Sequence, residues 1–313
     1  MIVALLVAAL PVLYWDQPTT TAGDLRRAGI ETLRVPQQRV AQWGREGFDA
    51  SPFSEQERSR RVGLRAPGIA TRADLASATR RPWIDANGWR YLRQPGGRFF
   101  ETVPRGVAVL AAAEAFAHAA DLVLAIDASD LEALGQALGF FRALPEAPLP
   151  GIADLVVVDD GSFATGELMN LLARRNLLFR PAARATPEPP LVVEIGSKAY
   201  PKSEAGNPDA IALEVRSRLT DERRSLRLFG SEVVLARLTG DAGRLRVHLV
   251  NYGGRDVEGL RVRVRGSWTP GGAHVLRHGR VAVLDPLLQD GALEFSLPVL
   301  GPYAVVDLVA APW

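Results

Sequence analysis

The chain of 313 residues contains no cysteine, which excludes disulfide bonds, thiolate catalysis and cysteine-ligated zinc. Histidine is nearly as scarce, with four residues in the whole chain, so we expect no histidine-built metal centre. The sequence does not exclude a calcium site with oxygen ligands, because the ligands of such a site need not follow a recognisable spacing. No cofactor is predicted.

Lysine is almost missing: two of the 37 basic residues are lysines, and 35 acidic residues leave a net charge of +2. The densest basic segments, 58–65 and 79–83, are short and flanked by acidic residues. A nucleic-acid-binding protein would instead carry an extended basic face. We therefore predict no nucleic-acid partner. The content of 47% hydrophobic and 23% charged residues is typical of a globular protein.

The apolar run at the N-terminus, "IVALLVAAL" (2–10), is too short to span a bilayer, and Pro11 follows it. Its apolar character and the small residues at its end are typical of a signal peptide, although no basic residue precedes the run. We predict that residues 1–9 are a signal peptide of a periplasmic or extracellular protein without an integral membrane segment in the mature chain. The alternative is a buried first strand in a cytoplasmic protein.

Short apolar runs alternate with helix-like segments between residues 10 and 222. Runs rich in valine, isoleucine and leucine between amphipathic segments are typical of parallel strands covered on both faces. The sequence therefore predicts an α/β domain over 10–222, either an incomplete TIM-like barrel, which we favour, or a doubly wound parallel sheet. The polar stretch 50–80 is not assigned. The expected strands are 11–15, 32–36, 122–127, 153–160, 177–181 and 191–196. The expected helices are 20–30, 39–48, 106–123, 130–144, 166–176 and 207–219.

The hydrophobic period changes to two beyond about residue 223. In "LRVRVRG" (260–266), Leu260, Val262 and Val264 alternate with arginines, as in a strand with one buried face. Similar segments follow, separated by glycine, proline and aspartate. The pattern predicts an antiparallel β-sandwich domain over 223–313.

The stretch "RVHLVNYGGRDVEGLRVRV" (246–264) resembles the C-terminal β-domain of multidomain, β-galactosidase-like glycoside hydrolases. In those domains a His-Leu-x-Asn-Tyr strand is followed by a turn and an alternating strand. The resemblance extends from Arg227 to the last residue and implies a β-sandwich that follows an α/β domain. Domains of this kind are usually structural, so the resemblance implies no catalytic residue, and residues 1–200 contain no catalytic motif of such a family.

A second resemblance concerns "VVVDDGS" (156–162), which is similar to the strand-end motif of family-2-type glycosyltransferases. The aspartates of that motif bind the nucleotide of a sugar donor, which implies such a role for Asp159 and Asp160. The companion Asp-x-Asp and Gln-x-x-Arg-Trp motifs of those enzymes are missing here. The alternative is structural: Gly161 turns the chain, and a hydroxyl group caps the next helix.

Tryptophans stand beside polar side chains in two short segments, 14–18 and 81–92. Proteins hold sugars with aromatic faces against the sugar C–H surface and with carboxylates and amides that bond the hydroxyls. The segments therefore favour a glycan cleft. The alternative is that the tryptophans anchor the core while the polar groups make local turn contacts. The predicted substrate-binding residues are Trp15, Trp83, Asn87, Trp89, Arg90 and Asp160.

Glycoside hydrolysis needs two carboxyl groups, about 5 Å apart for retention of configuration or about 6.5–9.5 Å apart for inversion. We select Asp16, Asp85 and Asp159 as candidate catalytic residues from the acids at the ends of expected strands. Glu114 and His118, four residues apart on one helix, are an acid–base pair or, as we favour, a buried hydrogen-bonded pair. The acids considered at strand ends are Asp16, Asp85, Asp127, Asp159, Asp160 and Glu194.

These observations together predict a glycoside-hydrolase-like, carbohydrate-active protein that hydrolyses or binds an oligo- or polysaccharide. Two alternatives stay open: a non-catalytic glycan-binding or structural protein derived from a glycosidase scaffold, and a glycosyltransferase. The non-catalytic alternative gains weight because a typical barrel takes about 250 residues, more than the α/β region offers.

Overall fold

The fold is taken from a computed structural model, which describes residues 10–70, 83–145, 147 and 149–311. The predicted signal peptide, residues 1–9, lies outside the described residues. The chain divides into two compact units, the first being Met1–Ile69 with Gln94–Pro148 and the second Ala70–Arg93 with Leu149–Trp313. The predicted domain boundary at residues 222–223 falls inside the second unit, where a helix ends and the antiparallel strands begin.

A parallel sheet of six strands, in the order β3-β2-β1-β8-β7-β4, is the centre of the first unit. The strand order reverses between β1 and β8, which pair directly. The strands are β1 (Val12–Tyr14), β2 (Thr32–Val35), β3 (Asp49–Pro52), β4 (Val62–Gly63), β7 (Arg98–Thr102) and β8 (Asp121–Ala125). The helices are α1 (Ala22–Arg27), α2 (Val40–Arg45), α3 (Glu55–Ser59), α5 (Ala108–Ala117) and α6 (Leu131–Ala143), with 3-10 turns η1 (Thr19–Thr21), η2 (Gln37–Arg39) and η3 (Ala128–Asp130).

The two faces of this sheet are packed differently because successive side chains of a strand point to opposite faces. One face carries leucines such as Leu13, which is buried and in register with Leu33 and Leu124. The other face carries an aromatic group in which the ring centre of Phe53 lies 5.2 Å from that of Tyr14. The alanine-rich helix α5 is buried along nearly its whole length, as its all-round apolar sequence predicts.

The second unit begins with a smaller α/β part, a parallel sheet of three strands in the order β10-β9-β11. Helices α4, α7 and α8 contribute to the same hydrophobic cluster as these strands, for example through Trp89, Leu168 and Val215. Its strands are β6 (Trp83–Asp85), β9 (Leu155–Val158), β10 (Phe179–Ala182) and β11 (Leu191–Val193), and β5 (Gly68–Ala70) precedes them. Its helices are α4 (Gly88–Arg93), α7 (Phe163–Arg174), η4 (Lys202–Glu204) and α8 (Pro208–Arg223).

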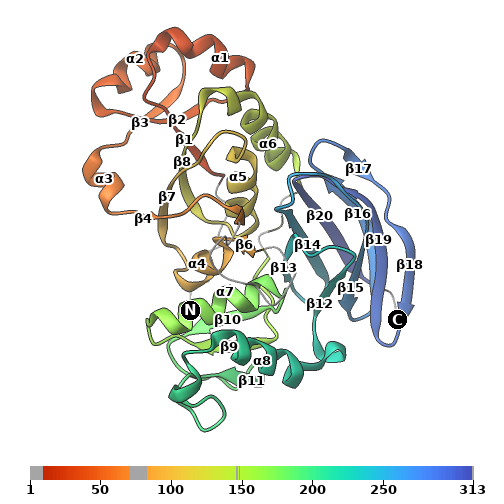
Figure 1. The fold of residues 1–313 in the computed structure, drawn as a ribbon. Coiled ribbons are helices and arrows are strands. Elements are labelled where there is room, and N and C mark those ends of the chain that lie inside the picture. The colour runs from red at the N-terminus through yellow and green to blue at the C-terminus, as the bar shows by residue number, and fades with distance from the viewer. Residues whose placement is uncertain (1–9, 71–82, 146, 148, 312–313) are drawn as a thin grey trace. The chain divides into compact units, whose positions relative to one another are not determined.

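Two antiparallel sheets complete the second unit, with the orders β12-β15-β19-β18 and β13-β14-β20-β16-β17. Both sheets contribute to one hydrophobic cluster, and they face each other in Figure 1. Leu260, Val262 and Val264 lie in this cluster, as the alternating pattern predicts. The strands are β12 (Leu226–Phe229), β13 (Val234–Gly240), β14 (Arg244–Asn251), β15 (Val257–Arg265), β16 (Trp268–Val275), β17 (Gly279–Val281), β18 (Leu284–Gln289), β19 (Ala292–Leu300) and β20 (Tyr303–Ala310).

The α/β part and the antiparallel sheets of the second unit are joined by polar contacts at the start of β9. Asp154 accepts hydrogen bonds from the N–H and, at 2.6 Å, from the hydroxyl of Ser225, just before β12. The backbone N–H of Ile152 donates to the carbonyl of Leu238 in β13 at 2.9 Å. Burial raises the pKa of Asp154, and the two bonds from Ser225 oppose that rise.

The general prediction of an α/β region followed by antiparallel sheets is confirmed, but the favoured barrel is not. A barrel closes only when its first and last strands pair. Among the described strands, β3 and β4 are the edges of one sheet, and β10 and β11 are the edges of the other. Alternating strands and helices are compatible with a barrel and with open sheets alike, so the sequence pattern alone could not separate these architectures.

Candidate functional site

The carboxyl end of β9 is built by the segment Asp159–Asp160–Gly161–Ser162. Gly161 has a φ of 77°, a conformation that favours glycine, and turns the chain out of the strand. Ser162 then caps α7, because its hydroxyl accepts a hydrogen bond from the backbone N–H of Thr165 at 3.2 Å. The structural alternative expected for this motif is therefore present in the fold.

Asp160 is held as an ionised acceptor at this turn. One of its carboxylate oxygens accepts from the backbone N–H of Ser162 at 2.9 Å and from the hydroxyl of Thr165 at 2.8 Å. Hydrogen bonding by Ser162, and then by Thr165, lowers the pKa of Asp160 from 3.8 to about 2, although burial acts to raise it. The group is therefore charged at all physiological pH values.

Asp159 is held by a bidentate ion pair with Arg93, the last residue of α4. The guanidinium Nε and Nη2 lie 2.8 and 2.7 Å from the two carboxylate oxygens, and Nη2 also donates to the carbonyl of Ser162 at 3.0 Å. Burial acts to raise the pKa of Asp159, but the bonds from Arg93 and from the Gly161 N–H outweigh it and lower the pKa overall. α4 is thereby tied to the end of β9.

Both aspartates at this turn are fixed in the ionised form, which decides what the arrangement can do. A glycosidase needs one carboxyl group with a raised pKa that can donate a proton to the leaving group. Asp159 and Asp160 both have lowered pKa values, so this turn offers acceptors and no proton donor. Its chemistry suits binding of hydroxyl groups.

The acid titration of Asp160 tests this description. A carboxyl group whose folded-state pKa is lowered contributes stability above its unfolded pKa and loses it as the pH falls through the folded value. We therefore expect an NMR titration of the Asp160 carboxyl carbon to have its midpoint near pH 2 instead of 3.8. Thr165→Val removes one hydrogen-bond donor and should raise the midpoint. A midpoint near 3.8 in both proteins would contradict the hydrogen-bonded turn.

The predicted substrate-binding segment around α4 lies in the same unit, and its tryptophan faces pack against protein groups. Trp83 donates to Asp85 at 3.0 Å, and the guanidinium carbon of Arg174 lies 3.5 Å from the centre of its ring system. The guanidinium carbon of Arg90 lies 4.3 Å from the ring centre of Trp89, which is buried in the hydrophobic cluster. A sugar would have to displace these arginines to stack on the covered faces.

The polar members of that segment make local contacts. Asn87 is almost completely buried, and its amide oxygen accepts from the guanidinium of Arg90 at 3.1 Å. Arg90 also donates to the backbone carbonyl of Ala86 at 3.2 Å. These bonds fix the beginning of α4 and so position Arg93 one turn further along the helix.

Trp15 and Asp16 belong to the first unit, at the carboxyl end of β1. Trp15 is buried, and its indole N–H donates to the hydroxyl of Thr21 at 3.0 Å. Asp16 is exposed, with its carboxylate accepting from Gln17 at 3.0 Å. The candidate catalytic aspartates are thus divided between the units, and their membership of one site stays a prediction.

The remaining acids considered from the sequence are placed as follows. Asp127 caps η3 through bonds to the N–H and hydroxyl two residues further on, which lower its pKa. Glu194 is exposed directly after β11. Glu114 is fully buried on α5, and the ring of His118 lies 2.9 Å from the backbone carbonyl of Glu114.

Sequence reasoning missed two residues at the end of β9. The ion pair between Arg93 and Asp159 could not be predicted, because the chain contains many arginines and the sequence around Arg93 does not indicate which of them pairs with Asp159. Phe163, the first residue of α7, is 87% exposed. This exposure follows from the helical phase when the helix is taken to begin at Phe163. At 100° per residue, Phe163 lies away from Leu168 and Leu172, which belong to the buried side of the helix.

Within the described parts of the chain, no group of three or more histidine, aspartate or glutamate side chains is arranged to hold a metal ion. His274 and His278 are four residues apart, but they lie in and after a strand, and His278 pairs with Asp256 at 2.7 Å. No helix among the described residues combines the length and the apolar character that crossing a bilayer requires.

No protein-family model and no curated protein matches this chain. Among solved structures, α-L-fucosidase isoenzyme 2 from Paenibacillus thiaminolyticus is similar in fold, with a TM-score of 0.52 and 10% identity over 72% of this chain and 62% of that one. The chain therefore spans less than two thirds of that enzyme.

Two further structures have lower scores. A catalytic mutant of a GH42 β-galactosidase from G. stearothermophilus has a TM-score of 0.38 and 8% identity over 78% of this chain and 53% of that one. A GH30 endoxylanase from Clostridium papyrosolvens C71 has a TM-score of 0.25 and 10% identity over 97% of each chain. The structural neighbours are glycoside hydrolases, and the likeness concerns the fold alone.

Proposed function

We propose that this chain binds a glycan at the carboxyl end of β9 and does not hydrolyse it. The observation that carries the proposal is an exposed phenylalanine that begins α7 three residues after a fixed, ionised carboxylate. Phe163 follows Ser162 directly, and Ser162 donates its N–H to Asp160. A sugar ring could therefore place its C–H face on Phe163 and donate a hydroxyl to Asp160.

The fold of the chain supports a carbohydrate role. Its similarity to an α-L-fucosidase covers 72% of its residues. The two antiparallel sheets, which share one hydrophobic cluster, suit the β-sandwich implied by the resemblance of residues 246–264 to glycosidase domains. An extracellular glycan as partner would also suit the proposed export of the protein.

The same geometry favours binding over hydrolysis. Arg93 neutralises Asp159 through two short hydrogen bonds, and two donors hold Asp160. A proton donor would need a carboxyl group with a raised pKa close to a second carboxylate. Asp154, a carboxyl group of this unit whose pKa is raised, is bound by Ser225 at the opposite end of β9 and so does not serve this turn.

Phe163→Ala is the direct test of this proposal. Aromatic stacking contributes about 0.5–1.5 kcal/mol, so the affinity should fall by about twofold to tenfold. Isothermal titration with neutral α-L-fucosyl and galactosyl oligosaccharides measures it. Phe229→Ala removes the ring of a 36% exposed phenylalanine at the end of β12 and should leave the affinity unchanged.

Two outcomes would contradict the proposal. Absence of binding to any of these oligosaccharides by the unaltered protein would overturn glycan binding. Turnover of aryl α-L-fucosides or aryl β-galactosides would overturn the binding-only function in favour of hydrolysis. Asp→Asn substitution of Asp16, Asp85 and Asp159 would then identify which of the candidate acids are catalytic.

A further inference from the structure

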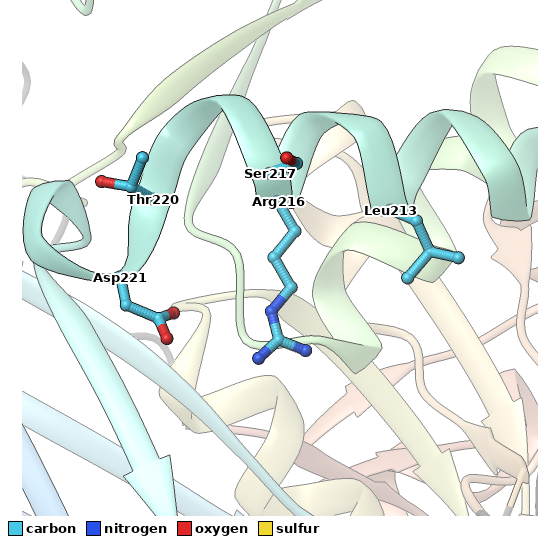
Figure 2. A pocket seen from close by; sticks show the side chains of 5 residues that line it. All are labelled: Leu213, Arg216, Ser217, Thr220 and Asp221. Carbon is cyan, nitrogen blue, oxygen red and sulfur yellow. The ribbon is translucent and has the colours of Figure 1, made fainter.

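An open groove runs along the outer side of α8, within the second unit. Its volume is about 350 Å³. Figure 2 shows the side chains that line it. In this view the side chain of Arg216 lies between the side chains of Asp221 and Leu213. The groove therefore combines a cation, a carboxylate, two hydroxyl groups and an apolar wall. Its described lining residues are Leu213, Arg216, Ser217, Thr220 and Asp221.

Arg216 is the unusual member of this set. It is half-buried, and no residue described by the structure forms a hydrogen bond or an ion pair with its guanidinium. Another arginine of the helix, Arg218, is paired with Glu214 at 2.7 Å. A partly desolvated cation without a counter-ion is unfavourable, so Arg216 is suited to receive an anion from outside the chain.

The carboxylate in the groove cannot serve as that counter-ion, because other arginines already hold it. Asp221 lies 3.3 Å from the guanidinium of Arg224 and 3.0 Å from that of Arg227. Burial lowers the pKa of Arg224, and repulsion from Arg216 and Arg227 lowers it further. The segment "RSRLTDERRSLR" (216–227) holds five arginines and two acids, so the surroundings of the groove stay positive.

The backbone at the groove is strained, which is a second and independent feature. Thr220 interrupts α8 with a φ of 55° and a ψ of 161°. A β-branched residue in such a conformation costs about 1–3 kcal/mol, and strain of this kind clusters at ligand sites. Thr220, together with Ser217 and Arg216, belongs to the lining of the groove.

We propose that this groove binds the carboxylate of an acidic sugar, a uronic acid residue of a glycan. A guanidinium presents parallel N–H groups that match the two oxygens of a carboxylate. Leu213, which is half-exposed, would cover the C–H surface of the sugar ring. The sugar part rests on the proposed glycan binding, whereas the carboxylate part rests on Arg216 alone.

The test compares methyl β-D-glucuronide with its methyl ester, because the two ligands differ in charge and share the sugar ring. The unaltered protein should bind the charged form more tightly, and Arg216→Gln should weaken that binding by about tenfold to a hundredfold, the effect of a charged hydrogen bond. Arg223→Gln removes an exposed arginine of the same helix and should change the affinity little. NMR titration of the amides of residues 213–221 measures these affinities and shows that each variant is folded.

Three results would overturn the inference. If the unaltered protein binds the methyl ester as tightly as the glucuronide, the groove does not recognise a carboxylate. If Arg216→Gln binds the glucuronide as tightly as the unaltered protein does, Arg216 is not the binding residue. If propionate binds as tightly as the glucuronide, the groove does not recognise the sugar ring. Loss of the Phe163-dependent binding of neutral oligosaccharides, with glucuronide binding intact, would instead overturn only the function proposed for the end of β9.

Discussion

Gly135→Ala is expected to destabilise the first unit by about 3 kcal/mol, the upper part of the range for overpacking a core. Gly135 lies in α6 where this helix crosses the end of α1. A Cβ at this position would stand 1.7 Å from the carbonyl oxygen of Ala28 and 2.7 Å from its carbonyl carbon. Those are backbone atoms, so a side-chain rotation cannot relieve the clash and one helix would have to move.

The control for this substitution is Gly139→Ala, one turn further along α6. Gly139 is exposed, and no heavy atom lies within 4 Å of a Cβ added there. Alanine should therefore stabilise the helix by about 0.5–1 kcal/mol. Urea unfolding followed by circular dichroism, with hydrogen exchange of the α6 amides, measures both effects. Equal changes in the two variants would show that the contact between α1 and α6 is not as close as described.

Phe295→Ala is expected to cost about 3–5 kcal/mol of the free energy of unfolding, because it removes a fully buried ring from the core between the antiparallel sheets. Phe295 lies on β19, a strand paired on both sides, opposite Val262 of β15. The cavity left behind cannot close easily when both neighbouring strands are fixed by hydrogen bonds.

The same change at Phe229 provides the comparison. Phe229 ends β12 at an edge of the same sheet and is 36% exposed. Phe229→Ala should therefore cost less than about 1 kcal/mol, part of it from lost stacking of Arg227 on the ring. Urea midpoints measured by tryptophan fluorescence would separate the two variants. A cost at Phe295 no larger than that at Phe229 would refute a single core shared by the sheets.

Local chemistry made much of the element order predictable. The alternation of Val262 and Val264 with arginines placed β15 correctly, since a period of two puts every second side chain on the buried face. The capped turn at Ser162 followed from glycine and hydroxyl residues at fixed offsets. The stretch 50–80 could not be assigned because β3 is short and without an apolar alternation, as in its exposed Asp49 and Pro52.

Contacts between residues far apart in the chain could not be predicted from the sequence. The parallel strands form two open sheets because of which strands pair with one another, and the helical and strand periods do not indicate that pairing. The pairing of Arg93 with Asp159 joins residues far apart in the chain. The exposure of Phe163 follows from the helical phase once α7 is known to begin at this residue, whereas the lack of a partner for Arg216 among the described residues required coordinates.

The second unit is built from two separate stretches of the chain, Ala70–Arg93 and Leu149–Trp313, and this affects how the unit folds during translation. Trp89 and Arg93 leave the ribosome roughly sixty residues before β9 is made, at about 5–20 residues per second. For some seconds α4 lacks both its packing partners and the counter-ion of its arginine. The second unit can therefore complete this part of its core only after Asp159 has emerged and α4 can dock.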